Sequence, residues 1–194
     1  MTQGDRAPSS ATGSQRLSHV AEDGSARLSH VAEDGSQRLS HVAEDGSARM
    51  VDVSEKQPSA RFATATGCVR LSPKAAGAVR EQALPKGDVL TIARIAGIQA
   101  AKRTWELIPL CHPIGLTGIE VDVELVGDVV QVAATTRTHD RTGVEMEALT
   151  AVAVAGLTII DMVKAIDQTA TISEVSVAVK GGGVHGEWRR EPGQ

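Results

Sequence analysis

The first part of the domain changes from strand-like to helical spacing of its apolar residues. The run from Arg61 to Leu71 predicts a strand, and Ser72-Pro73 provides the cap and first turn of a short helix that reaches about Gln82. A longer helix is expected from the cap residue Asp88 to Trp105, because apolar side chains follow helical spacing there until Pro109 ends it.

The second part contains two strands, a long helix and a last strand. Residues 117–126 alternate between apolar and acidic side chains, and residues 129–138 return after the turn Gly127-Asp128. Residues 144–166 predict an apolar helix, and residues 172–179 predict a strand. The order β-α-β-β-α-β indicates an α+β fold, with a ferredoxin-like antiparallel sheet and helices packed on one face. One small subunit would cover the long helix incompletely, so we expect an oligomer.

An 11-residue unit is repeated upstream of this domain, over residues 14–46. Each unit carries Asp-Gly-Ser and only two bulky apolar residues, which favours short hairpins or no fixed structure over a continuous helix. We therefore predict a flexible arm over residues 1–49, followed by a ferredoxin-like domain over 50–190 and a tail over 191–194. The repeated histidines permit a metal-binding interpretation, although tandem duplication is the simpler explanation: His19, His30 and His41.

Composition excludes several classes of function. The chain has two tryptophans, one phenylalanine, no tyrosine and a net charge of -4, which argues against nucleic acid as a partner. Cys68 and Cys111 form neither a disulfide framework nor a zinc motif, so no metal site is expected. The sequence predicts no membrane span and no secretory signal, and a cytoplasmic location follows by exclusion.

Two groups of charged residues mark the ends of the long apolar helix. Asp161 and Lys164 are three residues apart on one face, which suits general acid–base work, although a surface ion pair is an alternative. Glu145 and Glu147 flank Met146 in the first turn, where carboxylates also serve as ordinary caps. Because Glu147 and Asp161 lie about 21 Å apart along a helix, they either bind opposite ends of a long ligand or belong to a site that a second subunit completes. We expect the second arrangement, with a contribution from the first.

Other candidates lie in loops. Leu110, Cys111 and His112 follow the first long helix, and a buried cysteine beside a capping histidine is the alternative interpretation. Lys180 precedes three glycines whose amides could converge on phosphate, although a flexible turn has the same composition. Lys86 precedes a helix N-terminus and is a second candidate for a phosphate contact.

Taken together, these segments resemble the MoaC family of cyclic pyranopterin monophosphate synthases over about residues 39–188. The resemblance is carried by Met50-Val-Asp-Val-Ser54, Lys86-Gly-Asp88, Ala93-Arg-Ile-Ala-Gly-Ile-Gln-Ala-Ala-Lys-Arg-Thr-Trp105, Leu107-Ile-Pro-Leu-Cys-His-Pro113, Thr142-Gly-Val-Glu-Met-Glu-Ala-Leu-Thr150 and Asp161-Met-Val-Lys164. It implies a homo-hexamer built as a trimer of dimers, with sites at subunit interfaces. It also implies a nucleotide-derived substrate, 3',8-cyclo-7,8-dihydro-GTP, rearranged to cyclic pyranopterin monophosphate with loss of pyrophosphate in molybdenum cofactor biosynthesis.

The resemblance also implies roles for individual residues. Asp161 would be the catalytic acid or base and Lys164 its partner, while Lys86 and Lys180 would meet the triphosphate or the reacting ring. The residues implied to line the substrate pocket, with Glu145 beside it, are Leu110, Cys111, His112, Met146 and Glu147. No redox cofactor is implied, and Mg²⁺ as a companion of the triphosphate is left open.

One position departs from the family pattern. The glycine-rich loop often carries a second lysine where this chain has Val184, so one phosphate contact is either missing or supplied by His185. Two other functions stay open from the sequence: a non-catalytic nucleotide-binding module on the same fold, and a scaffold that binds a partner through the repeated arm.

Overall fold

The structure is a computed structural model, which describes residues 1, 47–183 and 186–191. The 11-residue repeats and their histidines lie outside the described residues, as do Val184, His185 and residues 192–194. The expectations of a flexible arm, of a tail and of a phosphate contact from His185 therefore stay predictions.

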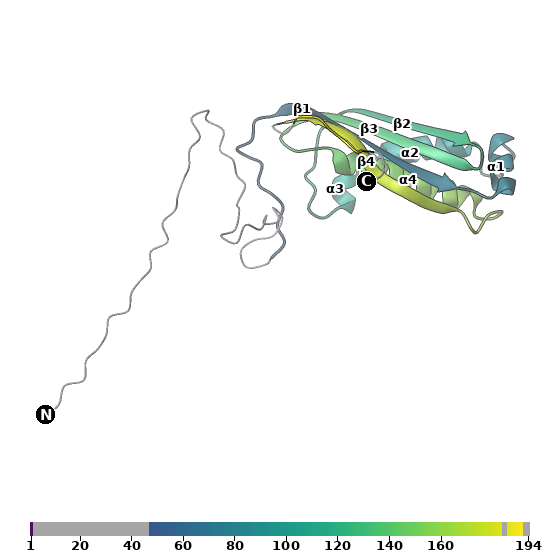
Figure 1. The fold of residues 1–194 in the computed structure, drawn as a ribbon, viewed down its shortest axis with the longest axis horizontal. Helices are drawn as coiled ribbons and strands as arrows, with labels where there is room; N and C mark the ends of the chain where they lie inside the picture. The colour runs from purple at the N-terminus through teal and green to yellow at the C-terminus, as the bar shows by residue number, and fades with distance from the viewer. Residues whose placement is uncertain (2–46, 184–185, 192–194) are drawn as a thin grey trace. The chain divides into compact units, whose positions relative to one another are not determined.

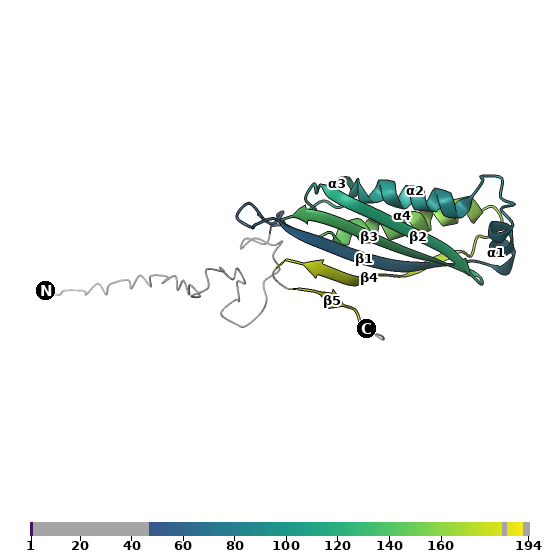
Figure 2. The same cartoon turned by 90° about the horizontal axis from the view of Figure 1, so that it is seen from above.

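The described domain is a five-stranded antiparallel sheet with strand order β2-β3-β1-β4-β5. Helices pack on one face of this sheet, as Figures 1 and 2 show, and the predicted α+β class is confirmed. The four long strands have the order expected of a β-α-β-β-α-β chain. The elements are β1 (Ser59–Arg70), α1 (Pro73–Arg80), α2 (Val89–Ala101), α3 (Thr104–Leu107), β2 (Leu116–Val126), β3 (Val129–Asp140), α4 (Glu145–Val163), β4 (Thr171–Gly182) and β5 (Trp188–Arg189).

Both predicted helix caps are present. The Ser72 hydroxyl accepts a hydrogen bond from the Ala75 amide at 3.3 Å, ahead of α1. Asp88 Oδ1 accepts from the amides of Leu90 and Thr91, each at 3.1 Å, ahead of α2. These side chains satisfy amides that have no partner within the helix, which is why the helices begin at these residues.

The prediction of one helix from Asp88 to Trp105 was wrong, because the helix ends at Ala101 and a separate short turn, α3, follows. The buried Thr104 hydroxyl donates to the carbonyls of Ala100 and Ala101 at 3.4 and 3.2 Å. A threonine side chain that bonds the last carbonyls competes with continued helical pairing. The other long helix ends at Val163, somewhat before the predicted residue 166.

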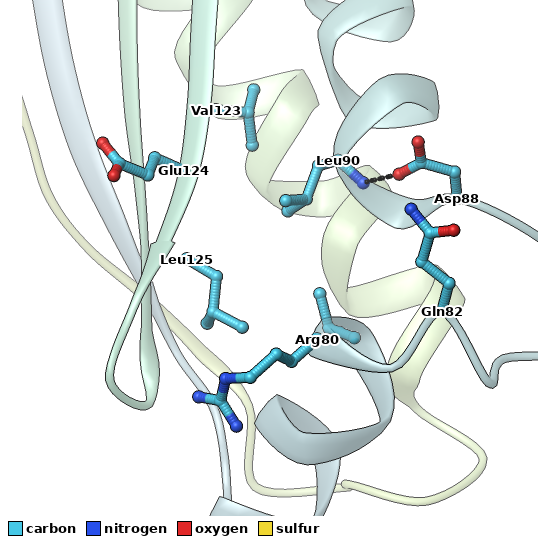
Figure 3. A pocket seen from close by; sticks show the side chains of 8 residues that line it. Arg80, Gln82, Asp88, Leu90, Val123, Glu124 and Leu125 are labelled. Carbon is cyan, nitrogen blue, oxygen red and sulfur yellow. Dashed lines mark hydrogen bonds between the residues drawn. The ribbon is translucent and has the colours of Figure 1, made fainter.

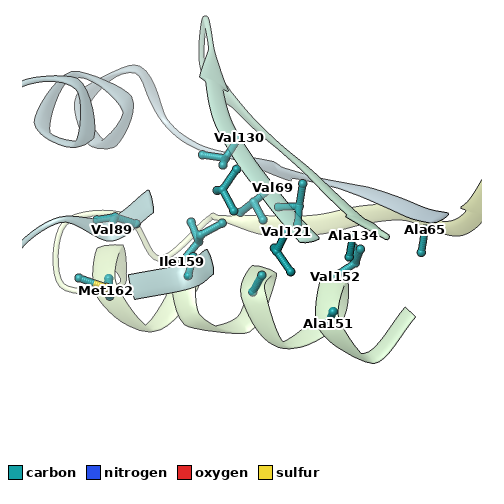
Figure 4. Close-up of a cluster of buried hydrophobic side chains, with 14 of the residues drawn as sticks. Ala65, Val69, Val89, Val121, Val130, Ala134, Ala151, Val152, Ile159 and Met162 are labelled. Atoms are coloured by element: carbon teal, nitrogen blue, oxygen red, sulfur yellow. The ribbon is translucent and has the colours of Figure 1, made fainter. Parts of the chain in front are cut away.

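The core lies between the sheet and the helices α2 and α4 (Figure 4). Its side chains are mostly valine and alanine, which allow close approach of the layers. At Gly97, for example, a Cβ would stand 3.0 Å from the Ala151 carbonyl oxygen, so α2 and α4 meet almost backbone to backbone. Labelled members of the core include Val69, Val121, Val130, Ala134, Val152 and Ile159.

Helix α4 corrects the prediction that no segment of the sequence has the length and composition of a membrane span. Within the described residues it is long and apolar enough, by length and composition alone, to pass for a membrane span. Its side chains Ala148, Ala151, Ala155 and Ile159 are fully buried in the domain, which is the position of a core helix. The lack of charge in the middle of α4 thus reflects burial.

Some apolar side chains on these helices stay uncovered in the single subunit. Leu157 of α4 and Ile95 of α2 are each more than half exposed, as is Leu107 of α3. Exposed leucine and isoleucine on packed helices leave apolar surface for a partner to cover. This agrees with the expectation that one subunit covers α4 incompletely.

Candidate active site

The predicted acid–base pair forms a three-residue cluster at the C-terminal end of α4. Lys164 Nζ donates to Asp161 Oδ1 at 2.8 Å, and Lys86 Nζ donates to Asp161 Oδ2 at 2.7 Å. Lys86 also donates to the backbone carbonyl of Asp161 at 2.9 Å, in the last turn of α4. Each carboxylate oxygen of Asp161 therefore binds a different ammonium group.

Sheet topology explains why Lys86 reaches a residue so distant in sequence. The end of β1 at Arg70 pairs with the start of β4 at Thr171, so the chain leaving β1 and the end of α4 share one edge of the domain. The loop after α1 then passes over the last turn of α4. Gly87, with a φ of 90°, turns this loop between Lys86 and the cap of α2.

The two lysines determine the ionisation of Asp161. The hydrogen bond from Lys164, followed by that from Lys86, lowers the pKa of Asp161 from 3.8 to about 2. Asp161 is therefore a carboxylate at every physiological pH. All three side chains are about half exposed, so another subunit or a substrate can approach them.

A second group lies at the N-terminal end of α4. Lys180 Nζ donates to Glu145 Oε1 at 2.9 Å. The start of β1 at Arg61 pairs with Gly182 of β4, and Ser59 pairs with the end of β3 at Asp140, just before α4 begins. The strand register therefore places the end of β4 beside the first turn of α4.

Glu147 is the buried carboxyl of this second group, with 3% of its surface exposed. Burial, and then the negative charge of Glu145, raises the pKa of Glu147 from 4.5 to about 7. Burial and the nearby Glu147 also raise the pKa of the Cys111 thiol. Cys111 is therefore a neutral thiol near neutral pH, which makes it a poor nucleophile.

His112, Leu110 and Met146 complete this end of the domain. His112 Nε2 lies 2.7 Å from the backbone carbonyl oxygen of Val51, and so holds the segment that leads into the domain. This contact with a backbone carbonyl is consistent with the alternative interpretation, in which His112 is a capping residue. Leu110 is half-buried, and Met146 is 38% exposed in the first turn of α4.

The structure brings the predicted residues together in two groups, and it does not join the groups within one subunit. Glu147 and Asp161 stand near opposite ends of α4, about 21 Å apart at the rise of an α-helix. The sequence alone did not indicate the contact between Lys86 and Asp161. It also did not indicate that the Glu145 carboxylate folds back over Gly143.

None of the predicted site residues lines either of two hollows found on the described surface. One hollow, of about 320 Å³, lies between α1, α2 and β2, with Arg80, Asp88 and Glu124 around Leu90 and Val123 (Figure 3). The other, of about 220 Å³, lies on β1, β2 and β3 around Cys68 and Gln131. Over residues 47–183 and 186–191, no group of three or more His, Cys, Asp or Glu is arranged to hold a metal ion.

Comparison with known proteins identifies the family. The MoaC family matches residues 50–183, which include both groups of site residues. The chain belongs to the MoaC family. Cyclic pyranopterin monophosphate synthase of Streptomyces griseus is 54% identical over 137 residues, covering 71% of this chain and 77% of the relative. The enzyme of the same name from Streptomyces avermitilis is 56% identical and covered to 81% of its length.

A relative with lower identity matches the same share of this chain. Cyclic pyranopterin monophosphate synthase 2 of Mycobacterium tuberculosis is 50% identical over 137 residues, covering 71% of this chain and 82% of the relative. The ferredoxin protease FusC aligns over 52% of this chain and 10% of its own, with a TM-score of 0.30, which is too low to inform the fold. The resemblance to the MoaC family is thus confirmed.

Proposed function

We propose that the two groups at the ends of α4 form one active site between neighbouring subunits, where 3',8-cyclo-7,8-dihydro-GTP is rearranged to cyclic pyranopterin monophosphate and pyrophosphate. Membership of the MoaC family makes the chain a cyclic pyranopterin monophosphate synthase, a lyase of molybdenum cofactor biosynthesis. The observation that carries the proposed site is the cluster of Asp161, Lys86 and Lys164. The charged side chains of this cluster are exposed to solvent, and they lie at the opposite end of α4 from the second group.

The chemistry of the cluster suits the reaction. Opening the purine imidazole ring and closing the pyranopterin ring need several proton transfers, and an ammonium beside a carboxylate provides both a donor and an acceptor. With two lysines bound, Asp161 is a weak base because its pKa is about 2. A triphosphate that draws Lys86 or Lys164 away would leave Asp161 more basic. Substrate binding would in this way activate the carboxylate.

The residues of the second group complete the shared site, where Lys180 meets the same triphosphate from the neighbouring subunit. Glu147, with a pKa of about 7, can donate or accept a hydrogen bond near neutral pH. Lys180 and the glycines after it provide positive charge and backbone amides for phosphate oxygens. The neutral Cys111 and the half-buried Leu110 provide an apolar wall.

The catalytic roles are tested by following pyrophosphate and pterin formation from the cyclised dihydro-GTP. Asp161→Asn and Lys164→Ala are each expected to reduce turnover by about three orders of magnitude or more, the size typical of losing acid–base catalysis. Asp122→Asn and Lys74→Ala remove the same charges from exposed positions elsewhere, and these controls should retain wild-type turnover. Full activity in either site variant excludes that residue from the mechanism.

The oligomer proposed is the hexamer, built as a trimer of dimers. Exposed Leu157 and Ile95 support it, because a neighbouring subunit would bury them. Leu157→Glu is expected to dissociate the assembly in sedimentation experiments and to abolish turnover. Val126→Glu, at the β2–β3 turn, places the same charge on another exposed apolar position as a control. A monomeric wild-type protein with full activity would refute the shared site.

Subunit mixing tests the sharing directly. Asp161→Asn and Lys180→Ala each remove a charged residue from opposite groups, so each variant alone is expected to be inactive. After subunit exchange, some interfaces in a mixed assembly contain one intact copy of each group, and part of the activity should return. If verified mixed assemblies stay inactive, the two groups do not belong to one site.

The cellular and cofactor assignments are part of the same proposal. We expect the enzyme to act in the cytoplasm, where its free cysteines stay reduced. We expect turnover without any redox cofactor. Excess EDTA shows whether Mg²⁺ accompanies the triphosphate: unchanged turnover means that the lysines alone neutralise the phosphate charge.

A further inference from the structure

The lysines at the two ends of α4 differ in how their charge is balanced. Lys86 and Lys164 share the single carboxylate of Asp161, so that cluster keeps a net positive charge. Lys180 instead pairs with Glu145 at 2.9 Å, one carboxylate for one ammonium. At this end of α4, a carboxylate of the protein already occupies the lysine that is expected to bind phosphate.

Glu145 is held where an incoming anion would also be stabilised. It is the first residue of α4, and the N-cap residue Val144 provides no side-chain acceptor for the free amides of the first turn. The Glu145 carboxylate folds back over Gly143, and its Oε2 fills the space that a Cβ at Gly143 would occupy. Negative charge is favoured at a helix N-terminus, and here Glu145 provides it.

The residues that follow Lys180 in the chain bring glycine backbone beside a second cation. Gly182 and Gly183 have φ values of 93° and 73°, conformations that side chains other than glycine rarely adopt. The Arg61 guanidinium lies against Gly183, so close that a Cβ there would stand 2.7 Å from Nη1. Lys180 is 47% exposed and Glu145 is 29% exposed, so the pair can open toward a ligand.

We propose that Glu145 is a competing counter-ion, which a phosphate group must displace from Lys180 and which reclaims Lys180 to speed the departure of pyrophosphate. This inference rests on the proposed function, because it takes Lys180 as a phosphate contact. Competition weakens the binding of substrate and product alike, and an enzyme gains turnover when it does not hold its product tightly. Glu145 thus acts on release, whereas Asp161 and Lys164 act on proton transfer.

The test is the affinity for pyrophosphate itself, measured by calorimetry on the full-length oligomer and as product inhibition of turnover. Glu145→Gln keeps the shape of the side chain and removes its charge. An exposed ion pair contributes up to about 1 kcal/mol, so the variant is expected to bind pyrophosphate roughly fivefold more tightly. The maximal rate should fall in the same variant, because release becomes slower.

Two further variants show whether the effect belongs to the pair. Glu120→Gln removes one negative charge from an exposed pair with Arg137, 3.7 Å apart on the sheet, and should leave pyrophosphate affinity within about twofold. In a Lys180→Ala background, Glu145→Gln should no longer tighten binding, because nothing is left to compete for.

An unchanged or weaker affinity in Glu145→Gln overturns the inference, and so does equal tightening in the Lys180→Ala background. Calorimetry measures these affinities whether or not the protein turns over. Failure of the proposed function has a different signature: the wild type forms no pterin, or Asp161→Asn stays active. If Lys180→Ala binds pyrophosphate as the wild type does, both the phosphate role of Lys180 and the competition are refuted.

Discussion

Glu147 allows a stability prediction with a definite sign and size. Its side chain is almost fully buried, and burial, helped by the charge of Glu145, raises its pKa from 4.5 to about 7. The folded protein therefore prefers the protonated carboxyl, whereas the unfolded chain ionises near 4.5. Stability from this residue is complete below pH 4.5 and is lost as the pH rises through 7.

The magnitude follows from the same shift. A rise of about 2.5 units corresponds, at 1.36 kcal/mol per unit, to about 3 kcal/mol at most above pH 8. Glu147→Gln stays neutral at every pH and so avoids this loss. At about 3 °C per kcal/mol for a domain of this size, the variant should melt up to roughly 9 °C above the wild type at pH 8.5. Near pH 4.5 the two should melt together.

The assay is thermal unfolding of both proteins from pH 4.5 to 8.5 at one subunit concentration. Glu106→Gln, an exposed glutamate in α3, is a control that should follow the wild type throughout. Parallel curves for Glu147→Gln and the wild type would show that Glu147 is ionised in the folded protein at neutral pH. A buried acid that lowers stability at neutral pH is typical of a functional site. If Glu147 does not lower stability there, this argument for its functional role is lost.

Three other changes have expected outcomes. Asp167→Ala should lower the free energy of unfolding by about 2–3 kcal/mol in denaturant, because the Asp167 carboxylate accepts a hydrogen bond from the Ser72 amide at 2.6 Å. The folded protein lowers the pKa of Asp167 to about 2, so the stability difference between variant and wild type should shrink below pH 4. A difference that stays constant with pH would contradict this. Gly67→Ala should lower the free energy of unfolding by about 1–3 kcal/mol, since the new Cβ would stand 2.7 Å from Val152 Cγ1. Gly77→Ala in α1, where nothing lies near the new Cβ, should raise it by about 0.5–1 kcal/mol. Equal effects of the two changes would refute the packing argument. Deletion of residues 1–46 should leave turnover unchanged, and a large loss would give the repeated arm a part in catalysis.

Local patterns in the sequence predicted most of the elements. The alternation over residues 117–126 and the caps at Ser72 and Asp88 depend on neighbours in the chain, so they are visible without a structure. The break after Ala101 was missed because it depends on how one side chain, Thr104, bonds the carbonyls before it. The two-residue strand β5 was missed because periodicity needs a longer window.

For the site, the sequence by itself determined which residue types are present and that Asp161 and Lys164 share one helical face. Only the tertiary structure decided that Lys86 bonds Asp161 from 75 positions away, and that Lys180 faces Glu145 from 35 positions away. Both contacts depend on β1 lying between β3 and β4, which brings the ends of those strands to the two ends of α4. Spacing along a chain sets which side chains share a face, whereas the order of strands in the sheet sets which distant groups meet.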